Sequence, residues 1–428
     1  MGPIDEVLLI LLLAGLAIFL GGFLLREAPI RKVRYRGQEA RARPGDQRMR
    51  RAFEVLAQAP LERGNRLEVL QNGDELFPRL FADVRAARRL ITWQVYWFKP
   101  GKLADEVADT LIERAQAGVE VLVLLDYFGS HGLPKKYIDA LRAGGVGVQI
   151  YRPLHWRGLY KVPHRSHVRS VVVDSQVGYT GGFGIDDQWR GSGRKRAEWR
   201  DTHVRIEGPV IDQLQAPFVA NWAECTGELL LGEGVMEAAE VAGGDSQRAA
   251  VMYASPSLGS TSAERFLALT LIAARKTLYI TNAYFVPNRG IRSLLCQAAA
   301  RGVDVRVLTP GSNTDARSAW YAGRFHYEEL LRAGVRLYEY GPTMVHAKTL
   351  VADEVWTSIG SMNFDNRSMK LNDEVALVAQ DEALGHELHA MFLRDLSFAD
   401  EVVLQDFAKR GRTARLRERA FWLVEALL

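Results

Sequence analysis

Residues 345–363, VHAKTLVADEVWTSIGSMN, place polar side chains within runs of valine, threonine and isoleucine that have the composition of β-strands. In a strand, side chains two positions apart share one face, so His346 and Lys348 point the same way. Ser361 and Asn363 also lie two apart and follow a glycine, so a neighbouring strand presents both of them. An imidazole, an ammonium group and two hydrogen-bonding side chains around one point suit a phosphoryl group.

The first half of the chain contains a similar pattern of residues at 167–184, HVRSVVVDSQVGYTGGFG. Three positions recur with the same mutual spacing, namely His167, Arg169 and Asp174 in the first copy and His346, Lys348 and Asp353 in the second. Arg169 replaces a lysine, while Gly182 and Gly184 replace the serine and the asparagine, so the second copy has the richer set of donors. We expect Asp353, on the opposite side of its strand or in the following turn, to hold the local structure by an ion pair.

Long segments around the two motifs also resemble each other. The segments LITWQVYWF (90–98), ERAQAGVEVLVLL (113–125) and LRAGGVGVQIYRP (141–153) recur as LYITNAYFVP (278–287), AAARGVDVRVLTP (298–310) and LRAGVRLYEYGP (331–342). In each copy a strand-length apolar run leads into an alanine-rich stretch of helical period and then a second strand. Such alternation is typical of an α/β sheet that is buried on both faces. The sequence therefore predicts an α/β fold of two halves related by a pseudo-twofold axis.

The N-terminus departs from this pattern. Residues 7–25, VLLILLLAGLAIFLGGFLL, carry no charge, and a helix of this length spans about 28 Å, enough for a bilayer core. A cleaved signal peptide is the alternative, but it needs basic residues before the apolar run, where this chain has Asp5 and Glu6. The basic residues follow the run instead, at Arg26, Arg31, Lys32, Arg34 and Arg36. We therefore predict an uncleaved single-pass anchor in the cell membrane, with the rest of the chain in the cytoplasm.

These patterns predict five segments: an anchor at residues 1–26, a basic juxtamembrane linker at 27–64, a first half at 65–231, a linker at 232–249 and a second half at 250–428. The basic linker either lies on anionic headgroups or is a solvated tether. At the C-terminus, RLRERAFWLVEALL places apolar side chains on one helical face beside arginines. This amphipathic helix either lies in a membrane interface or packs on the core.

The spacing His-x-Lys-x4-Asp, followed after six residues by Gly-Ser-x-Asn, is similar to the HKD signature of the phospholipase D superfamily. The two-copy layout resembles bacterial cardiolipin synthases in particular, as do WRDTHVRIEGPV (199–210) and NFDNRSMKLNDEVAL (363–377). The resemblance extends from about residue 65 to the C-terminus. It implies two phospholipase D-type α/β/α halves in one chain, a shared active-site cleft and a monomer with a pseudo-dimeric core.

The resemblance also implies a role for each site residue. His167 attacks phosphorus to form a phosphohistidine, and His346 protonates the departing alkoxide. The remaining residues it assigns are Arg169, Lys348, Ser361 and Asn363 around the phosphate, Asp201 and Glu374 as carboxylates that orient the histidines, and Asp174 and Asp353 as the last members of the two motifs. Neither a metal nor any other cofactor is implied.

Net charge, cysteine content and the predicted anchor limit the choice of substrate. A net charge of +4 is too small for this length to indicate nucleic acid, and the two cysteines cannot build a zinc site. The predicted anchor favours membrane phospholipid, with phosphatidylglycerol converted to cardiolipin and glycerol released. Transfer to water would make the same site a phospholipase D. A nuclease and an inactive lipid-binding scaffold stay open as alternatives.

Overall fold

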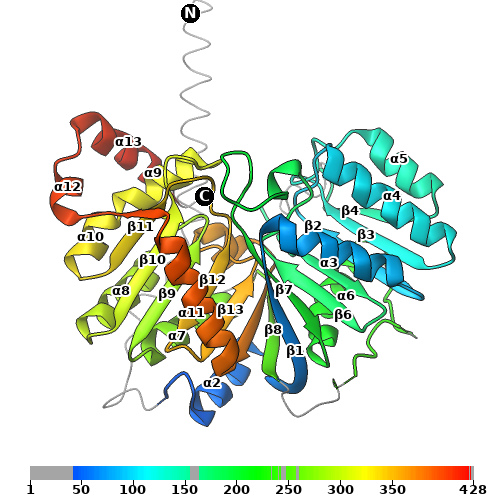
Figure 1. The fold of residues 1–428 in the computed structure, drawn as a ribbon, viewed down its shortest axis with the longest axis horizontal. Helices are drawn as coiled ribbons and strands as arrows, with labels where there is room; N and C mark the ends of the chain where they lie inside the picture. The colour runs from blue at the N-terminus through cyan, green and yellow to red at the C-terminus, as the bar shows by residue number, and fades with distance from the viewer. Residues whose placement is uncertain are drawn as a thin grey trace, which may run out of the picture.

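The computed structural model describes residues 42–154, 163–232, 234–239, 241, 247–256, 260–423 and 425 (Figure 1). The predicted anchor at residues 1–26 lies outside the described residues, as does the first part of the predicted juxtamembrane linker. Within the described ranges, no helix is long and apolar enough to cross a membrane.

The strands fall into two sets of seven. The first set is β1 (Glu62–Gln71), β2 (Leu90–Val95), β3 (Glu120–Asp126), β4 (Gly147–Tyr151), β5 (Ser170–Val173), β6 (Val177–Gly181) and β7 (Thr202–Glu207). The second set is β8 (Gln247–Ala254), β9 (Thr277–Asn282), β10 (Asp304–Pro310), β11 (Arg336–Tyr340), β12 (Lys348–Ala352), β13 (Trp356–Gly360) and β14 (Glu374–Gln380). A short strand, β15 (Ala399–Glu401), extends the second set at its edge.

All these strands form one sheet in the order β15-β11-β10-β9-β12-β13-β14-β8-β1-β7-β6-β5-β2-β3-β4. Outward from the central pair β8 and β1, each strand of the second set occupies the place of its counterpart in the first. The two sets join where β1 and β8 pair antiparallel. Both sets therefore have the same topology, and the predicted α/β fold is confirmed.

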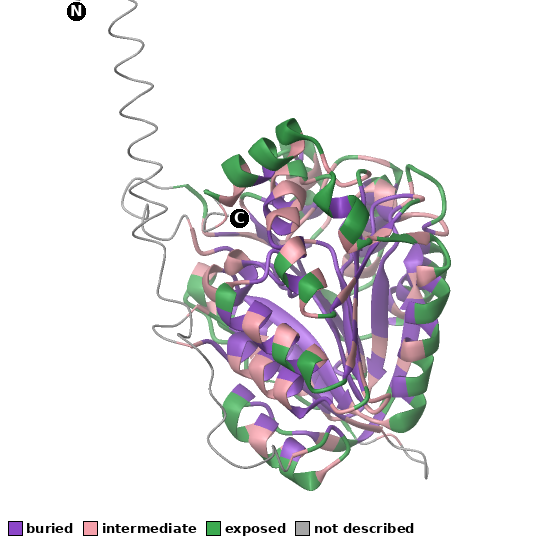
Figure 2. Cartoon of the chain, turned by 90° about the vertical axis from the view of Figure 1, so that its left-hand side faces the viewer, coloured by how far each residue is buried: buried purple, intermediate pink, exposed green. Residues whose placement is uncertain are grey.

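Helices cover both faces of this sheet. The first half contributes α3 (Asn72–Ala86), α4 (Lys102–Gln116), α5 (Lys135–Ala143) and α6 (Val210–Thr226). The second half contributes α7 (Ser262–Ala273), α8 (Arg289–Ala300), α9 (Arg317–Phe325), α10 (Tyr327–Arg332), α11 (Glu382–Leu396), α12 (Leu404–Ala408) and α13 (Arg412–Trp422). Buried residues gather on the strands and on the sides of the helices that face them (Figure 2).

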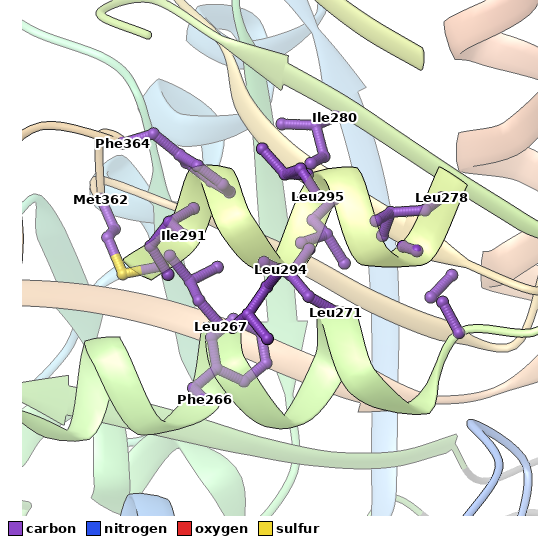
Figure 3. Packing of buried hydrophobic residues seen from close by; sticks show 14 of the residues in the cluster. Phe266, Leu267, Leu271, Leu278, Ile280, Ile291, Leu294, Leu295, Met362 and Phe364 are labelled. Carbon is purple, nitrogen blue, oxygen red and sulfur yellow. The ribbon is translucent and has the colours of Figure 1, made fainter. Parts of the chain in front are cut away.

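Alternate residues of the central strand β8 enter two different cores. Ala250 and Met252 belong to the core built on α7 and α8, part of which Figure 3 shows, and Ala249 and Val251 belong to the core built on α6 and α11. Side chains of successive strand residues point to opposite faces, so a sheet that is covered on both sides needs apolar residues at every position. This double burial explains why strands such as β2 and β3 are nearly continuous apolar runs.

The second part of the predicted basic linker, residues 27–64, is not a linker in the structure, because it contains a helix and the start of β1. Residues 47–57 form a helix, α2 (Gln47–Ala57), in which Met49, Phe53 and Ala57 are buried. The ring of Phe53 packs edge-on against Trp356 at 5.3 Å. These apolar residues recur every four positions on one helical face, a pattern hidden among three arginines. The strands β1 and β8 also each begin three residues before the starts predicted for the two halves, at 65 and 250.

The two motif aspartates lie in tight turns at the far ends of β5 and β12, away from the histidines. Asp353, at a left-handed φ of 51°, accepts hydrogen bonds from the backbone N–H groups of residues 275, 276 and 277, the shortest to each being 2.9, 2.7 and 3.0 Å. Asp174 accepts from residues 88, 89 and 90 at 2.8, 2.8 and 2.9 Å. The ion pair predicted for Asp353 is therefore wrong, because its carboxylate binds backbone N–H groups instead. Neither aspartate lies beside the histidines, although the sequence pattern grouped both with the catalytic residues. The reason is that the intervening strand carries each aspartate to its opposite end.

Replacing Asp353 with alanine is expected to lower the free energy of unfolding by about 2–4 kcal/mol, because three backbone N–H groups lose their acceptor. Asp353→Asn keeps one acceptor oxygen and tolerates the left-handed backbone, so its loss should be smaller. Denaturant unfolding followed by tryptophan fluorescence measures both. Equal stability of wild type and Asp353→Ala would contradict a structural role for this carboxylate.

Candidate active site

The two histidines lie just before β5 and β12, at the edge of the sheet where β2 and β9 end. In the register of the sheet, Ser170 is opposite Gln94 and Lys348 is opposite Asn282. The backbone N–H of His167 donates to the carbonyl of residue 373 at 2.8 Å, and that of His346 donates to the carbonyl of residue 200 at 2.7 Å. Each histidine is therefore tied through its backbone to the opposite half of the chain.

Each imidazole is also held by a carboxylate from the other half. His167 Nδ1 lies 3.0 Å from both carboxylate oxygens of Glu374, and His346 Nδ1 lies 2.9 Å from Asp201 Oδ2. All four side chains are buried. The sequence predicted these two carboxylates as orienting groups, and the structure adds that the pairs cross between the halves. Donation from Nδ1 to a carboxylate fixes the tautomer in which Nε2 carries the free lone pair.

Two cationic side chains lie beside the imidazoles. Lys348 Nζ is 2.8 Å from His346 Nε2, and Arg169 Nη1 is 3.3 Å from His167 Nδ1. Arg169 Nε and Asn363 Oδ1 are buried, and neither has a hydrogen-bond partner within the described part of the chain. Unsatisfied buried polar atoms are rare in folded proteins and need a specific explanation. A bound ligand with both donor and acceptor atoms would satisfy these two.

Ser361, predicted to contact the phosphate, lies at the site, where its hydroxyl is bound to a carboxylate. Its hydroxyl donates to Glu374 Oε2 and accepts from the backbone N–H of Val375 at 3.0 Å. The hydroxyl of Ser368 donates to the other oxygen of Glu374 at 2.6 Å. Ser361 therefore supports the carboxylate that holds His167, and Ser368, which the sequence reasoning missed, shares this role.

The first half holds its carboxylate in a different way. Asp201 Oδ2 accepts from Trp189 Nε1 at 2.8 Å, and Oδ1 accepts from the backbone N–H of Thr202 at 2.8 Å. Gly182, the counterpart of Ser361, leaves room for this carboxylate, since a Cβ atom there would lie 2.2 Å from Asp201 Oδ1. The glycine is thus the residue that this packing requires.

Burial and neighbouring charges shift the pKa values of the whole cluster. Burial raises the pKa of Glu374 to about 8, although the hydroxyls of Ser361 and Ser368 act in the opposite direction. Burial also raises the pKa of Asp201, but the imidazoles of His203 and His346 outweigh it, and the net pKa lies below the usual range. The two carboxylates of the site therefore differ in how readily they ionise.

The pKa values of the basic groups are all lowered. Burial lowers the pKa of His167, and the guanidinium of Arg169 lowers it further. Burial together with Lys348 lowers the pKa of His346, and burial lowers that of Lys348 itself. The site therefore disfavours additional positive charge, and a bound anion would raise these pKa values.

Comparison with known proteins places the chain in a family. A family model described as "Cardiolipin synthase, PLD-like domain" matches residues 267–396, which include the second motif. Cardiolipin synthase A of Pseudomonas syringae is 34% identical over 379 residues, covering 88% of this chain and 78% of that protein. The chain belongs to the cardiolipin synthase family.

Further similarities agree with this membership of the cardiolipin synthase family. Cardiolipin synthase 2 of Bacillus anthracis is 34% identical over 360 residues, covering 84% of this chain and 70% of that protein. The crystal structure of phosphatidylserine synthase from Haemophilus influenzae superimposes with a TM-score of 0.69, covering 90% of this chain and all of that one. At 14% identity, this last similarity shows the fold alone.

Two tyrosines that the sequence reasoning missed line the site of this cardiolipin synthase family member. The ring of Tyr96 meets the ring of His167 edge-on at 5.1 Å, and the ring of Tyr284 meets that of His346 at 6.1 Å. The hydroxyl of Tyr284 donates to Asp315 Oδ2 at 2.8 Å. Each tyrosine lies six residues after the leucine that begins the repeated apolar segment, Leu90 or Leu278. The internal repeat could therefore have identified both tyrosines. Within the described residues, no cluster of three histidine, cysteine, aspartate or glutamate side chains is arranged to hold a metal ion.

The raised pKa of Glu374 predicts a specific pH dependence of stability. Its folded-state pKa of about 8 lies above the unfolded value, so its contribution is complete below about pH 4 and is lost as the pH rises toward 8. Relative to Glu374→Gln, the wild type should therefore lose up to about 1.4 kcal/mol of stability per pH unit between pH 5 and 8. Denaturation midpoints of both proteins at matched pH measure this difference. A constant difference across that range would contradict the raised pKa of Glu374.

Proposed function

We propose that the protein is a cardiolipin synthase-type phosphatidyltransferase, in which one phosphatidylglycerol donates its phosphatidyl group to a second and glycerol is released. The observation that carries this proposal is the pair of crossed contacts, His167 with Glu374 and His346 with Asp201. They hold two imidazoles in a defined tautomer, beside a lysine and an arginine. Membership of the cardiolipin synthase family gives the substrate class.

The reaction proceeds in two displacements. The Nε2 lone pair of His167 attacks phosphorus, a P–N bond forms, and the P–O bond to glycerol breaks. His346 gives its proton to the glycerol oxygen as that bond breaks. In the second displacement, His346 accepts the proton of a hydroxyl on the second phosphatidylglycerol. That oxygen then attacks phosphorus and His167 is released.

The difference between the two carboxylates supports this assignment of roles. Asp201, which is held ionised, stabilises a positive charge on His346, as a general acid requires. Glu374, whose pKa is raised to about 8, gives less support to a charge on His167, which must be neutral to attack. A bound phosphate anion raises the pKa of Lys348 and of His346, so His346 takes up a proton from solvent when the substrate binds.

Membrane attachment and location belong to the same proposal. The predicted anchor at residues 1–26 would hold the catalytic halves at the cytoplasmic face of the cell membrane, where phospholipid headgroups are abundant. Each half supplies one histidine and one carboxylate, so a single chain holds a complete set and would act as a monomer.

The products formed from phosphatidylglycerol test the proposal. Full-length protein is incubated with phosphatidylglycerol in mixed micelles, and the lipids are resolved by mass spectrometry. Cardiolipin together with free glycerol is the expected result. Phosphatidic acid without cardiolipin would instead make the protein a hydrolase, and cleavage of single-stranded DNA with intact lipid would make it a nuclease. No turnover of either would favour the scaffold.

A further inference from the structure

Helix α13 presents two chemically different faces. On its inner face, Glu418 is buried and accepts from Arg410 Nε at 2.8 Å, and the ring of Phe421 stacks on Tyr321 at 5.5 Å. Glu425, just beyond the helix, accepts from His326 Nε2 at 2.7 Å. These contacts fix the rotation of the helix about its axis. They also show that packing on the core, one of the two alternatives for the C-terminal segment, uses only one face.

The outer face combines apolar side chains with positive charge. Leu416 is 68% exposed and Leu423 is 59% exposed, and together with exposed Ala420 they form a stripe at i, i+4 and i+7. Four exposed arginines flank this stripe, namely Arg412, Arg415, Arg417 and Arg419. Both glutamates of the segment make the inward contacts described above. None of the four arginines forms an ion pair with a carboxylate within the described residues.

An amphipathic helix whose polar flanks are basic suits the boundary between acyl chains and anionic headgroups. We propose that the outer face of α13 docks on the surface of an anionic phospholipid bilayer. The apolar stripe would enter the headgroup zone, and the arginines would contact the phosphates. Residues 26–36, near the start of the sequence, are themselves basic and are therefore not complementary to this face.

Docking at this place would bring lipid to the candidate active site. Phe421 of α13 packs in one apolar cluster with Tyr284, whose ring lies 6.1 Å from that of His346. The carbonyl of Glu425 accepts from Asn366 Nδ2 at 3.3 Å, in the segment that follows β13. Helix α13 thus stands at the same edge of the sheet as the histidines, whereas α2 lies at the opposite end (Figure 1). This inference rests on the proposed function for its choice of lipid as the partner.

Hydrogen exchange of the full-length protein in lipid nanodiscs tests the docking. Nanodiscs of phosphatidylcholine alone are compared with nanodiscs that contain about 30% phosphatidic acid, an anionic monoester without the diester bond that the site would cleave. We expect the amides of residues 412–423 to exchange at least about fivefold more slowly in the anionic nanodiscs. Arg412→Gln/Arg419→Gln should lose most of this protection. Arg48→Gln/Arg51→Gln, which removes the same charge from exposed positions on α2, should keep it.

Equal exchange of α13 in both kinds of nanodisc would overturn the proposal, and so would full protection in the Arg412→Gln/Arg419→Gln variant. Protection by single-stranded DNA but not by anionic lipid would also overturn it. The outcome is independent of catalysis, because His346→Ala should dock like the wild type. Failure of the proposed function would appear instead in the product assay with phosphatidylglycerol.

Discussion

His346→Ala and His167→Ala should each lower phosphatidyl transfer by at least about a thousandfold, because the acid and the nucleophile act as a unit. The expected loss follows from their geometry, since each imidazole is buried and bound through Nδ1 to a carboxylate of the other half. Cardiolipin formation in mixed micelles measures it. The matched control is His386→Ala, which removes an exposed histidine from α11 and should retain full activity.

A second substrate separates the two roles. If the leaving group is a nitrophenol, which departs without a proton, His346→Ala should still release a burst of nitrophenol, because the acid is then dispensable for the first displacement. His167→Ala should release none, since no nucleophile remains. The reverse pattern would exchange the two assignments, and near-parental cardiolipin formation by either variant would refute the site.

Gly182→Ser should lower activity by about a hundredfold, even though it restores the serine that the second motif carries at this position. A Cβ atom at residue 182 would lie 2.2 Å from Asp201 Oδ1, so the carboxylate must move away from His346. The steady-state rate of cardiolipin formation measures the loss. Circular dichroism shows whether the variant is folded.

The matched control for this substitution is Gly232→Ser, because no atom lies within 4 Å of a Cβ built at residue 232. It should leave the rate unchanged. If Gly182→Ser matched the wild type, or exceeded it, the glycine would be a tolerated departure from the family pattern and not a requirement of the packing around Asp201.

The internal repeat made most of the fold predictable. Apolar runs of strand length, followed by alanine-rich stretches in the same order twice, indicated two α/β halves, and the sheet has that duplicated order. Helix α2 was hidden, because Met49 and Phe53 stand among arginines in a segment with linker composition. The composition of a segment is an average over all its residues, whereas the burial of a helix depends on the residues of one face.

The candidate site was predictable in its members but not in its contacts. Glu374 is twenty-eight residues from His346 and far from His167 in sequence, yet it binds His167. That pairing depends on how the two halves pack against each other, and a local sequence pattern does not predict this packing. Ser361 likewise matched a phosphate-binding signature, but its hydroxyl is directed to a carboxylate. The spacing of residues along one strand predicts which face of the sheet a side chain lies on. It does not predict which residue of the other half that side chain contacts.

The exchange of carboxylates between the halves has a consequence for incomplete chains. A polypeptide that stopped before residue 232 would contain His167 without Glu374, and a fragment that began after it would contain His346 without Asp201. Neither fragment could set the tautomer of its own imidazole. Truncated translation products and proteolytic remnants should therefore lack transferase activity.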